Sequence, residues 1–382
     1  MVAQAIGEDA GTGTRIAAAS RWKFLHGQEG LARLAEATDS RARPRAADGI
    51  SDISCLKAAA WAASASQSTI FVAEYRGHGG DVLLPFRSYC QMRVCHVVPL
   101  TAPLSQYAPD PVRPLRVDAI GGLLQLLRED KGADLLLMRR VREDNPLSTG
   151  LEACGAHPAV HCHAPYIDLA AFANYQAYLK SFSRKSRRSR ERGTAKLKRE
   201  FGSIGFSVIP GARAGAALIT ALAWKRAWLR EQGVTSVVFD GGPWEAAFLE
   251  CAAAPNAFLS VLDVAGRPVA VELGFVTDRD YASYFGAYDP AFGCYRVGQE
   301  QISRTVGWCF ERGIERFDLL APWDAYKRHW TRSSTAVAVA DYAVPLSTTG
   351  SFAAFAHCRL RPLAKRVRDA MPRRLRRGLA AA

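Results

Sequence analysis

The stretch Phe258–Trp330 decides the fold class of this chain. Turns at Ala265–Pro268 and Asp278–Asp280 separate its first three apolar runs. It contains FLSVLDV (258–264), VAVELGFV (269–276), YASYFGAY (281–288), EQISRTVGWCFERG (300–313), IERFDLL (314–320) and APWDAYKRHW (321–330). Alternating apolar runs between Gly, Pro and Asp turns predict a β-meander, and the amphipathic run predicts a helix followed by another strand.

Composition narrows the class of protein and its partners. With 382 residues and 49% hydrophobic content, the chain can fill two domain cores. Its net charge of +14 favours an anionic partner: nucleic acid, a phosphate-rich cofactor or an acidic membrane face. The nine cysteines show no repeated CxxC pair, which predicts a reducing compartment without a disulfide framework. There is no signal-peptide pattern and no apolar run long enough to span a membrane, so we expect a cytoplasmic protein.

Four segments are expected along the chain. Residues 1–20 are small and polar and predict disorder. Residues 21–165 and 166–345 each alternate helix with strand and hairpin, which indicates a duplicated unit; within the first, 145–165 are expected as a loop-rich linker. Residues 346–382 form a basic tail.

Glu272 is the first candidate for chemistry. By the two-residue period of a strand, it lies on the opposite face from its large apolar neighbours, between Ala270 and Gly274. Small neighbours leave space for another group to approach this carboxylate, as a general base requires. A solvated outer face of the sheet gives the same pattern.

Residues around the predicted helix start are candidates for phosphate binding and proton transfer. Arg296-Val297-Gly298 precedes the amphipathic helix; Gly298 allows close backbone approach and Arg296 adds charge. An ordinary helix start has the same sequence. Tyr288 ends the third run before Asp289-Pro290, which makes it a candidate proton donor or a core aromatic residue.

The last strand and the segment after it supply three further candidates. Asp318 lies within an apolar run, where a charge is costly unless it is paired. Tyr326 and Lys327 offer a hydroxyl and an ammonium group close behind. A purely structural pairing of Asp318 fits equally well.

Two basic segments and one His/Cys cluster have ordinary alternatives. The tail from Arg359 mixes Leu, Val and Met with Arg, which suits a membrane-surface helix, another anionic partner or a disordered tail. The cluster Cys154–His163 fits no common zinc spacing, so no metal is expected. The other basic segment, residues 180–199, fits either a solvated helix face or a surface that binds nucleic acid. Phe182 is its only aromatic residue, which argues against recognition by stacking on bases. Its ten cations are Lys180, Arg184, Lys185, Arg187, Arg188, Arg190, Arg192, Lys196, Lys198 and Arg199.

Several of these segments together resemble a known family. They are the basic helix LKSFSRKSRRSRERGTAKLKREFG (179–202), GRPVAVELGF, YFGAYDPAF and the block YRVG…FDLLAPWDAYKRHW. They are similar to acetyltransferases of the CelD/BcsL type, GNAT-superfamily proteins associated with bacterial cellulose and other exopolysaccharides and related to FemAB-type transferases. Asp318, Tyr326, Lys327 and Trp330 match the FD…YK…W end of that pattern. The resemblance covers about residues 22–345.

The resemblance implies an α/β (α+β) fold of two tandem GNAT-like units, with mixed, mostly antiparallel sheets flanked by helices. It also implies acetyl-CoA or another acyl-CoA as co-substrate, held between YASYFGAY and IERFDLL with its pyrophosphate near Gly298. The expected donor-site residues are Tyr284, Phe285, Arg296, Val297 and Gly298.

The implied reaction is acyl transfer to a sugar, a polysaccharide precursor or an amine. Glu272 is expected to be the general base, with Tyr288 or Tyr326 protonating the departing thiolate. Lys327 is expected to bind an anionic part of a substrate, oriented, like Tyr326, by Asp318. Two alternatives stay open: a FemAB-like transferase using aminoacyl-tRNA, and a non-catalytic assembly factor for polysaccharide export at the inner-membrane surface.

Overall fold

The computed structural model describes residues 21–37, 48–50, 52–77, 80–111, 115–156, 158–331 and 335–361, together with 363 and 367. The predicted disorder of 1–20 and most of the basic tail lie outside them. The first half contains β1 (Trp22–His26), α2 (Gly27–Glu36), α3 (Ile53–Ala65), β2 (Thr69–Gly77), β3 (Gly80–Gln91), β4 (Val94–Pro99), α4 (Val117–Lys131), β5 (Leu135–Arg142), α5 (Pro146–Ala153) and β6 (Pro158–Asp168).

The second half repeats this order of elements after two additional helices. It contains α6 (Tyr175–Lys180), α7 (Arg184–Phe201), β7 (Ile204–Pro210), α8 (Gly215–Gln232), α9 (Pro243–Ala252), β8 (Ala257–Val264), β9 (Arg267–Thr277), β10 (Asp280–Tyr288), the 3-10 turn η3 (Pro290–Tyr295), α10 (Val297–Glu311), β11 (Arg316–Asp318), η4 (Lys327–His329), β12 (Ala336–Pro345) and α11 (Thr348–Phe355). Each half therefore runs strand, two helices, three antiparallel strands, helix, strand, as the duplicated-unit prediction requires.

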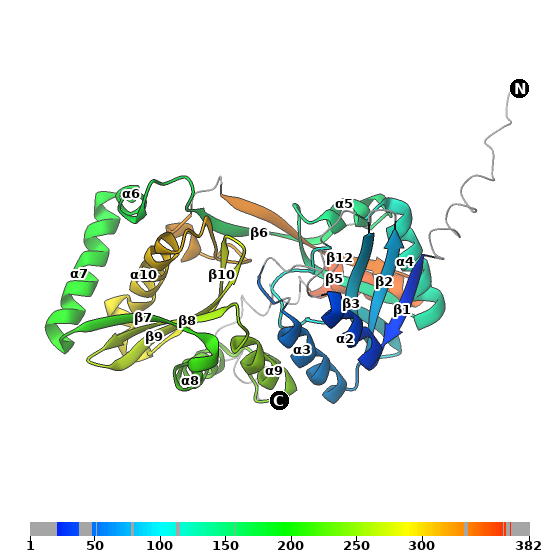
Figure 1. Cartoon of the computed structure of the whole chain (residues 1–382), viewed down its shortest axis with the longest axis horizontal. Helices are drawn as coiled ribbons and strands as arrows, with labels where there is room; N and C mark the ends of the chain where they lie inside the picture. Colours follow the sequence, from blue (N-terminus) through cyan, green and yellow to red (C-terminus); the bar gives the residue numbers. More distant parts are fainter. Residues whose placement is uncertain are drawn as a thin grey trace, which may run out of the picture.

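The strands of the described chain form one mixed sheet in the order β1-β2-β3-β4-β5-β12-β6-β11-β10-β9-β8-β7. The two halves lie side by side, and β6 and β12 cross the middle of the molecule between them (Figure 1). Most neighbouring pairs are antiparallel, while β4–β5 and β10–β11 are parallel. The expected α/β class with mixed, mostly antiparallel strands and flanking helices is confirmed.

The two halves exchange their last strands. β6 pairs with β11 of the second half, and β12 follows β11 in the chain but pairs with β5 of the first half. The predicted boundary at residue 165 therefore cuts through β6. The predicted second domain, residues 166–345, includes β12, which pairs with β5 of the first half. The order of elements in the sequence does not reveal this exchange, because each of these strands pairs with residues far away in the chain.

The predicted linker 145–165 is wrong, because this range holds α5 and most of β6. Asn145 caps α5 by accepting a hydrogen bond from the Leu147 N–H, and Pro146 occupies its first turn. A second difference is a disulfide between Cys90 and Cys95. These residues are separated in sequence but directly opposite in the β3–β4 ladder.

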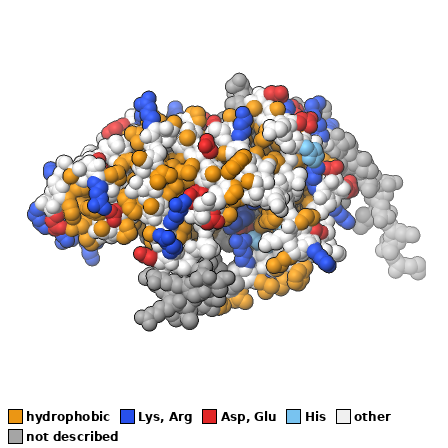
Figure 2. All heavy atoms as spheres, turned by 90° about the horizontal axis from the view of Figure 1, so that it is seen from below, with side chains coloured by type: hydrophobic (Ala, Val, Ile, Leu, Met, Phe, Trp, Pro, Cys, Tyr) orange, Lys and Arg blue, Asp and Glu red, His pale blue; other side chains and the backbone are white. Residues whose placement is uncertain are grey.

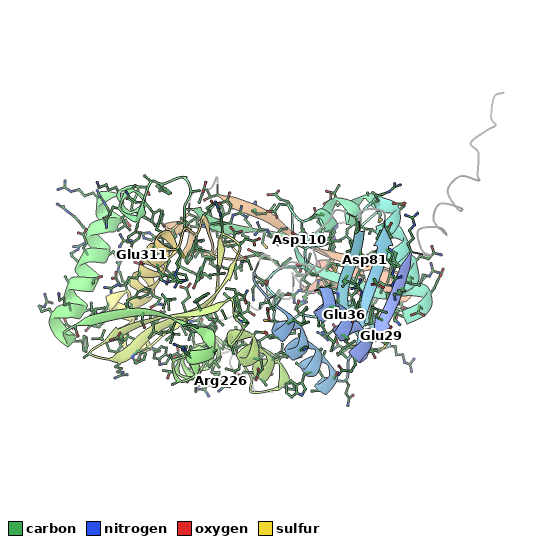
Figure 3. All side chains as sticks on the ribbon, viewed as in Figure 1. Glu29, Glu36, Asp81, Asp110, Arg226 and Glu311 are labelled. Atoms are coloured by element: carbon green, nitrogen blue, oxygen red, sulfur yellow. A yellow bond between two sulfur atoms is a disulfide. The ribbon has the colours of Figure 1, made fainter. Side chains whose placement is uncertain are left out.

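Two large hydrophobic clusters fix the halves. One packs α4 and α5 against the first half of the sheet. The other joins both halves, because α3 packs against α9 and the shared cluster includes Leu56, Phe248 and Phe285. The labelled residues in Figure 3 mark the two halves. Glu29, Glu36 and Asp81 lie in the first half, Glu311 lies in the second half, and Asp110 lies between them in this view.

Candidate active site

The strands β10 and β11 separate soon after they begin. Their parallel pairing covers only Asp280–Ala282 and Arg316–Asp318. β10 then continues to Tyr288, whereas the chain after Asp318 turns away through Leu320, whose φ is +60°. We call the interval beyond Ala282, where the two strands no longer pair, the gap. β10 ends beside the first turn of α10, because the Tyr288 ring lies 3.5 Å from the position that a Cβ atom would take at Gly298. The expected separation of YASYFGAY from IERFDLL is therefore present.

A β-bulge at Tyr284 bends β10 within this gap. The pairing with β9 shifts between Ser283 and Phe285, and a bulge turns the following side chains to the other face. Phe285 is buried among Phe239 and Phe248, and the Tyr284 hydroxyl donates to the Leu104 carbonyl. The side chains of Tyr284 and Phe285 therefore belong to the core on the α8–α9 side. Their side chains do not support the expected role in donor binding, because they are held in the core.

Glu272 is the buried carboxylate of the site. It lies on β9 on the α10 side of the sheet, is 3% exposed and accepts a hydrogen bond of 3.1 Å from the Tyr281 hydroxyl. Burial raises the pKa of Glu272 to about 7, and hydrogen bonds from Ser283 and Tyr281 act in the opposite direction. The solvated-face alternative is wrong. A carboxyl group with this pKa exchanges its proton readily near neutral pH.

Gly286 leaves open space on the sheet face that also carries this buried carboxylate. Gly286 is the cross-strand partner of Glu272, so the two share one face of the sheet. A Cβ atom added at Gly286 would meet nothing within 4 Å. Tyr288, two residues further along β10, lies on this face and is 47% exposed. Its ring lies 3.5 Å from the positions that Cβ atoms would take at Gly293 and Gly298.

Two arginines and a histidine from three different elements lie near the first turn of α10. Arg296 is the N-cap residue, with φ +59°, and its side chain makes no capping hydrogen bond. The first N–H groups of any helix lack acceptors within the helix. Burial lowers the pKa of His329, and the charges of Arg190 on α7 and Arg296 lower it further, so these three side chains lie within electrostatic reach of one another. The helix start at Val297, one residue before Gly298, can thus hold phosphate oxygens, although the Val297 side chain itself is buried.

Asp318 connects the two halves instead of orienting Lys327 or Tyr326. Its carboxylate binds Arg142 of β5 at 2.8 Å and accepts a hydrogen bond of 3.1 Å from the Tyr107 hydroxyl. It also accepts from the Leu320 N–H at 2.7 Å. The expected orienting role is corrected. The sheet order β5-β12-β6-β11 brings Arg142 of the first half near β11, and its guanidinium group pairs with the Asp318 carboxylate. The structural alternative for Asp318 is the one observed.

Lys327 and Tyr326 have opposite exposures. The Lys327 ammonium group is buried and donates to the carbonyl oxygens of Leu320 at 2.8 Å and Pro322 at 3.0 Å. Burial lowers its pKa to about 8. The expected substrate-anion role is corrected, because this group fixes the loop after β11. Tyr326 is 55% exposed, and burial of its hydroxyl, then the charges of Asp324 and Glu272, raise its pKa. Its phenol therefore lies within reach of the Glu272 charge.

Several residues around Glu272 were not singled out by sequence. Ser260 lies opposite Glu272 on β8, and its hydroxyl meets Thr305 at 2.9 Å. Gln301 on α10 donates to the Ser260 carbonyl oxygen at 2.8 Å, while its own buried carbonyl oxygen has no hydrogen-bond partner. The polar positions Ser260, Gln301 and Thr305 inside apolar runs were the available signal. Only the sheet register shows that they meet.

The comparisons with known proteins follow this geometry. Residues 181–328 match the protein family described as "Acetyltransferase (GNAT) domain". That range contains β10, β11, α10 and Glu272. This part of the chain is an acyltransferase domain. No curated protein sequence matches the chain.

Solved structures show the same fold over most of the acyltransferase chain at low sequence identity. FemX superposes with a TM-score of 0.56 at 10% identity, covering 85% of this chain and 97% of FemX. A conserved protein of unknown function from Bacteroides thetaiotaomicron gives 0.54 at 12% identity, covering 84% and 100%. The C-terminal domain of a putative lysylphosphatidylglycerol synthetase from Agrobacterium fabrum gives 0.51 at 15%, covering 86% and 94%. The expected tandem GNAT-like architecture agrees with these likenesses.

The described residues contain neither a cluster of metal ligands nor a membrane-spanning helix. No group of three His, Cys, Asp or Glu side chains in those ranges is arranged to hold a metal ion. No helix in the described part of the acyltransferase is both long and apolar enough to cross a bilayer.

Proposed function

We propose that this protein transfers an acetyl or larger acyl group from acyl-CoA to an amine or hydroxyl group of its acceptor. The observation that carries the proposal is the early separation of β10 from β11 in front of the α10 start. A donor chain lying in this gap would bring its acyl carbon alongside β10 on the Glu272 side. The gap, the helix start and the carboxylate are all parts of the matched range 181–328.

The residues at the α10 start fit the phosphates of such a donor. The first backbone N–H groups of α10, Arg296 and Arg190 would hold the pyrophosphate, since N–H groups at a helix start and guanidinium groups both favour phosphate oxygens. Gly193 lets α7 approach closely, because a Cβ atom there would lie 3.0 Å from the Tyr295 carbonyl oxygen. This contact keeps the arginines of α7 beside the donor end of the gap.

The proposed reaction is direct transfer. The acceptor nitrogen or oxygen attacks the acyl carbonyl carbon, the carbon–sulfur bond breaks, and Glu272 takes the acceptor's proton directly or through one water. Tyr288 or Tyr326 gives a proton to the thiolate and regains one from solvent. Tyr288 and Tyr326 are 47% and 55% exposed, so the ring of each borders solvent. Asp318 and Lys327 fix the loop that carries Tyr326.

We propose a sugar or a polysaccharide precursor as the acceptor class, within exopolysaccharide or cell-envelope synthesis. The resemblance to CelD/BcsL-type proteins supports this class. The exposed rings of Tyr288 and Tyr326 also support it, because a tyrosine offers an apolar face and a hydroxyl to a polar ring.

Calorimetric titration with acetyl-CoA tests the donor. Wild type should bind, and Gly298→Trp should abolish binding because the indole would fill the space beside Tyr288. Gly121→Trp is the matched control: it lies near the start of α4, the corresponding helix of the first half, where a Cβ atom meets nothing within 4 Å. Absence of binding to wild type at millimolar acetyl-CoA would disprove the proposal.

Aminoacyl-tRNA is the second candidate donor, and the exposed cations of α7 favour it. A tRNA held by several Lys and Arg side chains would lose affinity steeply as salt rises. Filter binding of bulk tRNA between low and physiological salt distinguishes the two donors. Tight, salt-sensitive tRNA binding together with silent acetyl-CoA titrations would select this second candidate.

A further inference from the structure

The last helical segment of the described chain has one side fixed to the sheet. α11 packs against β12, β4 and β5. Gly350 lies so close to the Asp134 carbonyl oxygen that a Cβ atom would come within 1.7 Å. Ala354 and Cys358 pack with Val98 and Leu135 in a small cluster. The orientation of the segment about its own axis is therefore set by the sheet.

The other side of this segment presents large apolar side chains to solvent. Phe352 is 72% exposed and Phe355 is 55% exposed. After one π-helical turn at Ala356–Leu360, Leu360, Leu363 and Val367 are at least half exposed as well. Phe352 and Phe355 are three residues apart and so lie on one side of α11, opposite the buried Ala354 and Gly350. We call the five exposed residues the apolar stripe.

Such a stripe is unlike the other exposed apolar groups of the molecule. Single exposed apolar side chains are normal on protein surfaces, whereas a contiguous row marks a binding face. On the face seen in Figure 2, hydrophobic side chains form several patches among charged and other polar ones. The stripe instead runs along α11 and the π-helical turn, and Leu363 and Val367 follow that turn in the sequence.

The positive charge of this segment indicates which kind of partner binds the apolar stripe. Arg359 and Arg361 are exposed on the same segment. From Arg359 to Arg377 the sequence has a single acidic residue, Asp369. Its cations are Arg359, Arg361, Lys365, Arg366, Arg368, Arg373, Arg374, Arg376 and Arg377. A helix with one apolar side and many arginines matches the boundary of an anionic bilayer, where apolar groups enter the acyl region and cations meet the headgroups.

We infer that the apolar stripe, Phe352 to Val367, docks this protein on an anionic lipid surface. The apolar side chains supply insertion, and the arginines supply attraction to negatively charged headgroups. The inference is independent of the proposed acyl transfer, because the stripe lies on the β4–β5–β12 part of the sheet and shares no residue with the candidate active site.

Co-sedimentation of the full chain with vesicles tests this inference. Wild type should bind vesicles of phosphatidylcholine with phosphatidylglycerol at least about tenfold more tightly than phosphatidylcholine alone, and the difference should shrink at high salt. The variant Phe352→Ser/Phe355→Ser/Leu360→Ser should lose about tenfold or more of its affinity for the anionic vesicles.

Trp61→Ser is the matched control, because Trp61 is a large exposed side chain on α3, outside the stripe. It should leave vesicle binding unchanged. The triple variant should keep the wild-type unfolding temperature and acetyl-CoA titration, which shows that its fold is intact. Equal binding to both vesicle types, or full binding by the triple variant, would overturn the inference. Capture of an acidic protein without any vesicle binding would also overturn it.

Discussion

Glu272 on β9 lies directly opposite Gly286 on β10, and both residues lie on the α10 side of the sheet. A side chain at Gly286 would stand over the acid, and glycine leaves that space empty. Burial raises the pKa of Glu272 to about 7. The space above Gly286 is where we propose that the acceptor approaches this carboxylate.

Replacement of Glu272 by glutamine should lower kcat by about 100-fold or more, because a positioned general base contributes roughly 10²–10⁴-fold. The wild-type rate should rise with pH and level off above the pKa near 7, since the carboxylate is the active form. Steady-state rates of acyl transfer between pH 5.5 and 8.5 measure both effects. A Glu272→Gln enzyme that keeps the wild-type rate and pH profile would contradict the role.

The same substitution should change stability with pH in a defined direction. The pKa of Glu272 is raised from 4.5 to about 7, so the folded state holds this proton more tightly than the unfolded state. Stability from Glu272 is present below pH 4.5 and is lost as pH rises to 7. Relative to wild type, Glu272→Gln should gain on the order of 3 kcal/mol at pH 8 and much less at pH 5. Urea unfolding at both pH values checks this, and equal differences at the two would refute it.

Gly286→Leu should keep the fold and lose acyl transfer. Gly286 is exposed and a Cβ atom there meets nothing within 4 Å, so we expect the unfolding temperature to stay within a few degrees of wild type. The rate should fall by about 100-fold because the route to Glu272 is covered. Gly286→Ala is the matched control and should retain most of the activity. A fully active leucine variant would show that the acceptor reaches the site elsewhere.

Tyr288→Phe and Tyr326→Phe should differ in rate if one tyrosine protonates the thiolate. The true donor should lose about 100-fold in kcat with little change in acetyl-CoA affinity, and the other should lose little. Pre-steady-state turnover of each variant distinguishes them. If both phenylalanine variants turn over at the wild-type rate, neither hydroxyl is the acid and water protonates the thiolate.

Asp318→Ala should destabilise the protein by about 3–5 kcal/mol, because it leaves the buried Arg142 without its partner across the two halves. Asp144→Ala is the control: Asp144 binds the same guanidinium at 2.7 Å but is half exposed, so its loss should cost about 1 kcal/mol or less. Guanidinium chloride unfolding of both variants measures the difference. Similar losses would mean that the buried pair adds nothing beyond a surface contact.

Local sequence pattern predicted the elements of the site well. The runs from Phe258 to Leu320 form β8, β9, β10, α10 and β11 in the predicted order. Side-chain direction was less predictable. Tyr284 and Phe285 turn into the core because of a bulge, and bulges depend on pairing with β9, which no local pattern in β10 reveals.

Sequence by itself determined the elements from Phe258 to Leu320, their order and the placement of Glu272 among small neighbours, because hydrophobic period and turn chemistry are local properties. It did not reveal α5 and most of β6. Tertiary structure decided the rest. The exchange of β6 and β12 brought Arg142 and Tyr107 to Asp318, and the fold of the loop after β11 turned Lys327 inwards. Buried charges take whichever partner long-range packing brings within reach, so their roles depend on contacts between residues far apart in the chain.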